Sequence, residues 1–330
     1  MSPRDLPLSQ SQLRFLRRGL LGWYDENRRD LPWRHDNDPY RVWISEIMLQ
    51  QTRVAAVLEH YARFMKRFPT VQSLAAARES SVLAAWSGLG YYHRARRMHQ
   101  AAKVIARGRA GVFPQTAEEW SELPGIGRYT AAAIASIVFS EGVAVVDGNV
   151  ERVLQRLFGA KLGREALWQQ AEALLDRKRP GDFNQAMMEL GATICAPRAP
   201  RCLLCPLNPH CKTRGAEQTA VRPARKNREL HYGLARRGGS VLLVQRPTNA
   251  SLMAGMWELP MLSPEQVNGE PALLRLRHSI TDTDYRVTVL ALPSDHLPNS
   301  ATEGRWFTAG QCRRLPLTGL ARKILRRAEA

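Results

Sequence analysis

The arrangement of cysteines constrains this chain more than any other feature of its sequence. Four of the five cysteines crowd into one stretch, at Cys195, Cys202, Cys205 and Cys211. Prolines recur in the same stretch, which favours a wrapped loop over a helix. Four thiolates in such a loop can enclose one metal centre, but the C-x6-C-x2-C-x5-C spacing fits a zinc site as well as an iron–sulfur cluster. Disulfides are the weaker alternative, because crowded cysteines in a reducing compartment more often bind a metal.

The charge of the chain fits a polyanionic partner. Lys and Arg number 48 against 30 Asp and Glu, which gives a formal net charge of +18. Cationic side chains release condensed counterions from phosphates, so nucleic acid is a plausible partner. Residues 1–10 lack the apolar core of a signal peptide, and no apolar run approaches the roughly 18 residues of a membrane span. We therefore expect a cytoplasmic, nucleoid-associated protein with no membrane partner.

The pattern of apolar residues divides the chain into a helical part and a smaller mixed part. Residues 1–211 are expected to form a mostly α domain, with helical segments at 42–51, 54–68, 128–140, 149–158, 165–177 and 183–194 and a further helix opened by the capping-box spacing of Thr116 and Glu119. Residues 212–230 are basic and lack apolar periodicity, which predicts an exposed linker. Residues 231–330 are predicted to form a small α+β domain, with strands at 240–245, 273–279, 285–292 and 305–308 and a helix at 320–328.

A short glycine motif between two helical patterns predicts a phosphate-binding turn. The motif is Leu-Pro-Gly-Ile-Gly at residues 123–127, followed directly by a helical pattern. Gly125 and Gly127 allow a tight turn and a close approach to a ligand, and the next helix presents free N–H groups. A DNA phosphate fits such a site without base preference. An ordinary turn between helices is the alternative, but on a chain of this charge a helix-hairpin-helix DNA clamp is favoured.

These motifs, in this order, resemble the endonuclease III superfamily and, within it, the mismatch adenine DNA glycosylases (the MutY family). The stretches that match lie at 31–34, 43–52, 88–92, 146–150 and 183–186, so the resemblance spans nearly the whole chain. It implies a helix-hairpin-helix glycosylase domain whose cysteine loop binds a [4Fe-4S] cluster, followed by a Nudix-like domain. It also implies a monomer that acts in base excision repair on double-stranded DNA containing adenine opposite 8-oxoguanine or guanine.

Two carboxylates match the catalytic positions of this family. Breaking the N-glycosidic bond of an intact purine requires a neutral acid to protonate the base and a carboxylate to stabilise the oxocarbenium-like sugar. Glu46 lies among Ile44, Ile47 and Met48, where loss of solvent would raise its pKa and keep it protonated. The resemblance makes Glu46 the acid that protonates adenine N7 and later activates water. It makes Asp147 the stabilising carboxylate, whereas the residues alone fit a helix cap equally well.

The residue after Arg128 decides which glycosylase class the resemblance implies. Relatives that also cut the strand carry a Schiff-base lysine at the position of Tyr129, and a phenol cannot form that bond. We therefore predict a monofunctional glycosylase in which Tyr129 supports the Asp147 side of the site and Asn149 hydrogen-bonds within it. A bifunctional, endonuclease III-type enzyme and a non-catalytic DNA-binding protein are the alternatives.

The resemblance also assigns residues to the two bases of the mispair. An adenine inside a duplex must be flipped out before it can be cut. Matching positions that line or support its pocket are Arg29, Trp33, Arg34 and Gln185. Gln51 and Tyr91 match residues that fill the gap beside the opposite base. Plain core packing competes with a ligand role for Trp33 and Tyr91, and a solvated surface charge competes for Arg29.

The C-terminal part resembles the Nudix-like domain of this family in residues 242–247 and 255–260. Residues 261–277 hold only Glu265 and Glu270, too few acids to bind magnesium and a pyrophosphate, so we expect binding without hydrolysis. The family reads 8-oxoguanine through a Phe-Ser-His loop. The best match here is Ile280-Thr281-Asp282, in which Thr281 keeps the hydroxyl while the aromatic ring and the imidazole are missing. The resemblance thus supports adenine excision more firmly than it supports recognition of the oxidised base.

Overall fold

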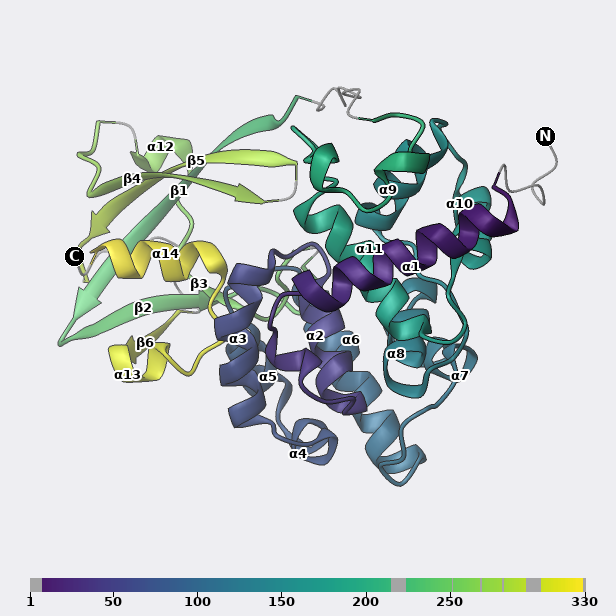
Figure 1. Ribbon diagram of the computed structural model, residues 1–330. Coiled ribbons are helices and arrows are strands. Elements are labelled where there is room, and N and C mark those ends of the chain that lie inside the picture. Colours follow the sequence, from purple (N-terminus) through teal and green to yellow (C-terminus); the bar gives the residue numbers. More distant parts are fainter. Residues whose placement is uncertain are drawn as a thin grey trace. The chain divides into compact units, whose positions relative to one another are not determined.

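The computed structural model describes residues 8–214, 224–250, 252–267, 269–280, 282–294 and 304–328 (Figure 1). Contacts divide the chain into two compact units. The helical unit comprises Met1–Ala75 and Gln100–Ala220, and the sheet unit comprises Ala76–His99 and Val221–Ala330. None of the helices in the described ranges combines the length and the apolar character that a membrane crossing requires.

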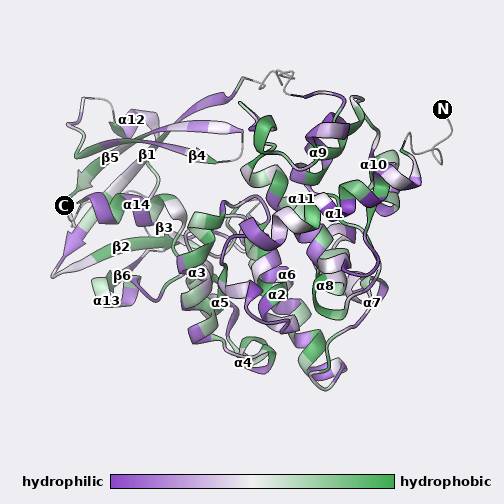
Figure 2. Cartoon of the chain, viewed as in Figure 1, coloured by the Kyte–Doolittle hydropathy of each residue, from purple (hydrophilic) through white to green (hydrophobic). Residues whose placement is uncertain are grey.

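The helical unit is built from helices that pack around a shared apolar core. Its elements are α1 (Gln10–Asn27), η1 (Pro32–Arg34), α2 (Pro39–Leu49), α3 (Val54–Arg67), α4 (Val71–Ala76), the short π-helix η2 (Val104–Gly108), α7 (Ala117–Ser121), α8 (Arg128–Phe139), α9 (Gly148–Phe158), α10 (Arg164–Leu174), α11 (Pro180–Thr193), η3 (Cys202–Leu204) and η4 (Asn208–His210). Leu16 and Leu20 of α1, Leu154 of α9 and Leu190 of α11 belong to one buried cluster. Green and purple residues mix along these ribbons in Figure 2, as expected for helices that bury one face.

The helix ends follow the capping signals of the sequence. Asp38 caps α2 by accepting a hydrogen bond from the N–H of Arg41 at 2.9 Å, and Pro39 opens the helix. Thr116 and Glu119 form the reciprocal capping box that their spacing predicts. The helix expected over 183–194 begins three residues earlier, because Pro180 occupies the first turn, where its missing N–H costs nothing.

The sheet unit contains α5 (Glu79–Trp86), most of α6 (Tyr92–Lys103) and a six-stranded sheet. The strands are β1 (Lys226–Arg237), β2 (Ser240–Gln245), β3 (Trp257–Glu258), β4 (Leu274–Ile280), β5 (Thr283–Leu292) and β6 (Arg305–Thr308), in the order β3-β2-β1-β5-β4 with β6 paired to β2. The strands β1 and β5 run parallel, and β4 and β5 form an antiparallel pair. Short helices α12 (Pro264–Val267) and α13 (Ala309–Cys312) and the terminal α14 (Gly319–Ala328) complete it.

Two sequence expectations need correction here. The predicted linker 212–230 is too long, because β1 already begins at Lys226 and pairs with β5 from that residue onward. The first half of β1 is exposed and charged, so it shows no alternation of apolar residues in the sequence. It forms a strand because it pairs with β5. Residues Ala76–His99 group by contact with the sheet unit rather than with the other helices. Ser87 Oγ, for example, donates to the carbonyl of Leu317 at 2.9 Å.

Candidate active site

Glu46 is a buried carboxyl group in the middle of α2. Only 6% of the residue is exposed, and its neighbours Ile44 and Met48 are fully buried. Tyr129 Oη donates a hydrogen bond to Glu46 Oε2 at 2.9 Å. Burial raises the pKa of Glu46 to about 7 against the lowering effect of that hydrogen bond, and the nearby charge of Asp147 adds to the rise. Glu46 can therefore carry a proton near neutral pH and also release it, as a general acid must.

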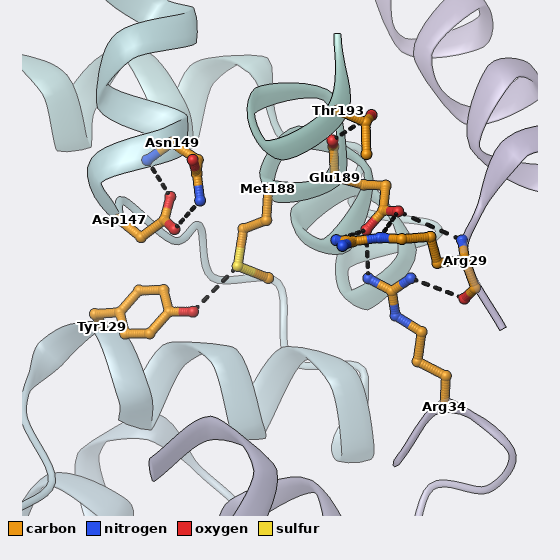
Figure 3. Close-up of polar contacts among 8 residues, drawn as sticks. All are labelled: Arg29, Arg34, Tyr129, Asp147, Asn149, Met188, Glu189 and Thr193. Carbon is orange, nitrogen blue, oxygen red and sulfur yellow. Dashed lines mark hydrogen bonds and ion pairs between the residues drawn. The ribbon is translucent and has the colours of Figure 1, made fainter. Parts of the chain in front are cut away.

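Tyr129, at the start of α8, faces both carboxylates. Its Oη also lies 3.1 Å from Met188 Sδ of α11, and Figure 3 shows the hydroxyl pointing toward that sulfur. Burial, followed by the charges of Glu46 and Asp147, raises the pKa of the phenol well above its usual value. The hydroxyl consequently stays protonated and serves as a fixed hydrogen-bond donor to Glu46.

Asp147 is the N-cap of α9, so the structural role that its sequence allows is present. Its Oδ1 accepts from the N–H groups of Asn149 and Val150 at 2.9 and 2.7 Å, and its Oδ2 accepts from Asn149 Nδ2 at 2.9 Å. The cap fixes the position of the carboxylate at the N-terminus of α9. Its charge acts on both Glu46 and Tyr129, so the capping residue also lies close to these two side chains.

Asn149 is in turn connected to the cysteine loop. Arg152 Nη2 donates to Asn149 Oδ1 at 2.9 Å and to the carbonyl of Gly191 at 2.6 Å, while its Nε donates to the carbonyl of Cys195 at 2.8 Å. A Cβ atom on Gly191 would lie only 2.6 Å from Asn149 Cβ, so α11 and the Asn149 turn meet without room for a side chain. One arginine therefore joins the Asp147–Asn149 turn to the first cysteine.

A buried glutamate, which the sequence did not single out, holds the two predicted pocket arginines. Glu189 of α11 is 1% exposed and accepts from Arg29 Nε and Nη2 at 2.5 and 2.9 Å and from Arg34 Nη2 at 3.0 Å (Figure 3). Burial alone would raise the pKa of Glu189, but the two guanidinium groups outweigh it and the net shift is downward. Gln185 lies one turn earlier on α11, at the helical spacing that shares a face with Met188 and Glu189.

Of two further predicted site residues, Trp33 is buried in the core and Gln51 is exposed at the surface. Trp33 is 6% exposed and packs its ring edge-on against Tyr61 at 5.1 Å between centroids, so the structure shows the core packing that competed with a ligand role. Gln51 is exposed in the turn after α2 and adopts a left-handed φ of 55°. Its neighbour Gln50 donates to Thr130 Oγ1 at 3.0 Å, which fixes the end of α2 against α8. Gln51 is thus held on the surface in a strained conformation.

The glycine hairpin joins α7 to α8. Leu123 and Ile126 are buried and anchor the turn, while Gly125 has a φ of 81°, which other residues adopt at a cost. Gly127 differs from the expectation, because its φ of −97° is available to any residue. As the N-cap of α8 it provides no side-chain cap, so the first N–H groups of the helix are left for another acceptor.

The four cysteines of the loop that follows α11 are partly buried and influence one another. Burial, together with the neighbouring thiols of Cys195, Cys211 and Cys202, raises the pKa of Cys205 to about 11. The buried Arg156 donates to Cys195 Sγ at 3.4 Å and to three carbonyls of the loop. Four thiols in one loop, with a guanidinium group donating a hydrogen bond to one of them, fit the ligand set of an iron–sulfur cluster. Within the described residues, no three His, Cys, Asp or Glu side chains are placed as a formed metal site.

Tyr91, in the sheet unit, borders a pocket of about 410 Å³ that Ser279 and Ile280 also line. Thr281 itself lies outside the described residues. Tyr91 has a left-handed φ of 47°, and the guanidinium of Arg94 lies 5.3 Å from its ring centroid. The same Arg94 donates to the carbonyls of Leu89 and Gly90, so a cation fixes the loop that carries Tyr91.

The helical fold, the glycine hairpin and the paired carboxylates define a DNA base-excision protein of the helix-hairpin-helix class. The HhH-GPD superfamily of base excision DNA repair proteins matches residues 44–176. A solved thermostable thymine-DNA glycosylase is 31% identical, with a TM-score of 0.58 over 62% of this chain and 97% of that protein.

Relatives that match nearly the whole of this chain narrow the class to a family. The adenine DNA glycosylase of Rattus norvegicus is 36% identical over 99% of this chain and 80% of its own length. The adenine DNA glycosylase of Homo sapiens is also 36% identical, over 94% of this chain and 73% of its length. The chain belongs to the adenine DNA glycosylase family, whose members are hydrolases that cleave N-glycosyl bonds.

Proposed function

We propose that this chain excises adenine mispaired with 8-oxoguanine or guanine in duplex DNA and leaves an abasic site. The observation that carries the proposal is the buried Glu46, which accepts a hydrogen bond from Tyr129 and has a pKa of about 7. The charge of Asp147, which is held by its hydrogen bonds at the start of α9, acts on this carboxyl group. Two carboxylates kept in different ionisation states are what acid-assisted cleavage of a glycosidic bond requires. Residues 1–211 would contain this chemistry, and residues 231–330 would read the opposite base.

The reaction follows from the two states. Protonated Glu46 gives its proton to N7 of the flipped adenine, which makes the base a neutral leaving group as the bond to C1′ breaks. Asp147 stabilises the resulting oxocarbenium-like sugar. The Glu46 carboxylate then takes a proton from the water that attacks C1′, so the acid is regenerated. Arg29 and Arg34, fixed by Glu189, and Gln185 on the same helix face would line and support the purine pocket.

The opposite base would be read in the sheet unit. The pocket beside Tyr91 is lined by the two residues that precede Thr281, which supports the assignment of that hairpin to the opposite strand. This Nudix-like domain would bind DNA without hydrolysing a nucleotide, because residues 261–277 hold just two acids. Exposed Gln51, in its strained turn, fits the role of filling the gap that the flipped adenine leaves.

The cysteine loop would hold a [4Fe-4S] cluster through Cys195, Cys202, Cys205 and Cys211. The cluster would give the loop a fixed shape, which Arg152 and Arg156 connect to α9 and the Asp147–Asn149 turn. We expect the purified protein to be brown and to contain about four iron atoms per chain. Metal analysis of the wild-type chain tests this, with Cys312→Ser as the matched control that keeps its iron. A colourless protein loaded with zinc would contradict the assignment.

Tyr129 should decide whether the strand is cut. We expect Tyr129→Lys to gain weak strand cleavage without alkali, because an amine beside Asp147 can attack C1′ and form a Schiff base. Tyr129→Phe is the control, as it also removes the hydroxyl but supplies no amine. Borohydride trapping of a covalent protein–DNA complex provides the measurement. If the lysine variant traps no more than the phenylalanine variant, position alone does not confer lyase chemistry.

Single-turnover excision on short duplexes tests the whole proposal. The duplexes carry adenine opposite 8-oxoguanine, guanine, cytosine or thymine, and each reaction is analysed with and without hot alkali. We expect breaks after alkali alone, from adenine opposite the two guanines. Breaks without alkali would place the chain with the bifunctional, endonuclease III-type enzymes. Tight duplex binding without any break would make it a DNA-binding protein.

A further inference from the structure

A hollow lined by arginines lies against strands β4 and β5 in the sheet unit. Its volume is about 580 Å³. The arginine face consists of Arg275 and Arg277 of β4, Arg286 of β5 and Arg327 of α14. Glu229 of β1 is the one acid that lines the same hollow. The local excess of positive charge is therefore three.

The register of the sheet holds two of these cations against each other. Arg277 and Arg286 are direct partners in the antiparallel pair of β4 and β5. Side chains at such positions leave the sheet about 5 Å apart, and like charges there destabilise the pair. The one ion pair in the hollow joins Arg286 to Glu229 at 4.0 Å, between two well-exposed side chains. Within the described ranges Arg275, Arg277 and Arg327 have no ion pair at 4.0 Å or less, although the charge of Arg277 helps to lower the pKa of Asp284 on β5.

The packing of the opposite face prevents the strands from relieving this repulsion. Leu276 of β4 and Val287 of β5 are buried in the apolar cluster that includes Leu320 and Ile324 of α14. Because side chains alternate along a strand, turning the arginines inward would expose these residues. The repulsion is thus built into the sheet, and an anion in the hollow would remove it.

The lining indicates what kind of anion fits. Guanidinium groups bind phosphate oxygens in bidentate fashion, and four of them in one open hollow suit several phosphates. No aromatic residue lines the hollow, so it offers no ring on which a base could stack. A backbone of repeated phosphates therefore fits better than a nucleotide that must be held by its base. The net charge of +18 favours the same partner.

We propose that the arginine face binds the phosphodiester backbone of duplex DNA without regard to sequence. The inference rests on the proposed function, which makes duplex DNA the substrate. Binding there would add affinity and a dependence on salt to the sheet unit, while the bases are read elsewhere.

The test compares two double variants in the full chain. Arg275→Gln with Arg277→Gln removes two cations of the face, and Arg313→Gln with Arg314→Gln removes two exposed cations of the same unit outside it. Affinity for a fully paired duplex is measured from 50 to 200 mM salt, and thermal unfolding verifies that both variants fold. We expect the first variant to bind roughly tenfold more weakly at 50 mM, with a salt slope smaller by about two. The control should keep the wild-type slope.

Two outcomes would overturn the proposal. The slopes of both variants could fall equally, which would mean that general charge acts rather than the face. The first variant could keep the wild-type slope. In that second case, a loss of pyrophosphate binding measured alongside would make the hollow a site for small phosphate compounds. Since the duplex contains no mispair, the comparison does not depend on excision. Failure of wild-type excision would count against the proposed function alone.

Discussion

Glu46→Gln is expected to slow single-turnover excision of adenine by about 10²–10⁴-fold and to leave binding of the mispaired duplex nearly unchanged. The amide has the size of the acid and still accepts the hydrogen bond of Tyr129, but it has no proton of suitable acidity for N7. The wild-type rate should itself fall as pH rises through about 7, the pKa to which burial raises Glu46. Excision assays from pH 5.5 to 9 measure both effects, and undiminished excision by the variant would refute the acid assignment.

Glu46→Gln should also show how much the ionisation of the buried Glu46 lowers the stability of the wild-type fold at high pH. In the unfolded chain Glu46 has a pKa near 4.5, and in the folded chain about 7, so the folded state holds the proton more tightly. This contribution to stability is complete below pH 4.5 and is lost as pH rises through 7. Glutamine stays neutral throughout. The variant should therefore be more stable than the wild type at pH 8, by about 3 kcal/mol, and equal to it near pH 4.5. Urea unfolding at the two pH values gives the difference.

Local signals explain which parts of the fold could be predicted. The strands at 240–245 and 305–308 have the predicted bounds, because apolar and aromatic residues such as Val241, Leu243 and Phe307 mark them locally. The first half of β1 carries charged residues and is a strand because β5 pairs with it, a partner more than fifty residues away that no local pattern indicates. The grouping of Ala76–His99 with the sheet unit depends in the same way on distant contacts.

In the candidate site, too, local sequence signals predict some residues, while others depend on distant contacts. The burial of Glu46 follows from the apolar residues beside it in α2, and the capping role of Asp147 follows from its place before a helix. Glu189 could not be identified in this way, because the arginines that it binds lie 155 and 160 residues earlier in the chain. The feature of the sequence that could have pointed to Glu189 is its position four residues after Gln185, on the same helix. Which groups oppose one another in space is decided by tertiary packing.

Asp147→Asn should separate the two roles of this residue. Asparagine caps helices about as well as aspartate, so the hydrogen bonds to the N–H groups of Asn149 and Val150 can persist. The charge that would stabilise the oxocarbenium-like sugar is lost, and we expect excision to slow by about 10²–10³-fold, as when one electrostatic stabiliser is removed. Unfolding free energy should change little, whereas Asp147→Ala, which loses cap and charge together, should cost about 1 kcal/mol more.

The paired variants distinguish a catalytic carboxylate from a merely structural one. If Asp147 acted through the cap alone, the rate would follow stability, so the asparagine variant would excise at nearly the wild-type rate and the alanine variant would be slow. If its charge acts on the sugar, both variants are equally slow although only one is destabilised. The Asp147 charge also helps to raise the pKa of Glu46, so the asparagine variant should hold that proton less tightly and lose activity from a lower pH. A pH–rate profile of its residual activity that matched the wild type would show that the two carboxylates do not interact.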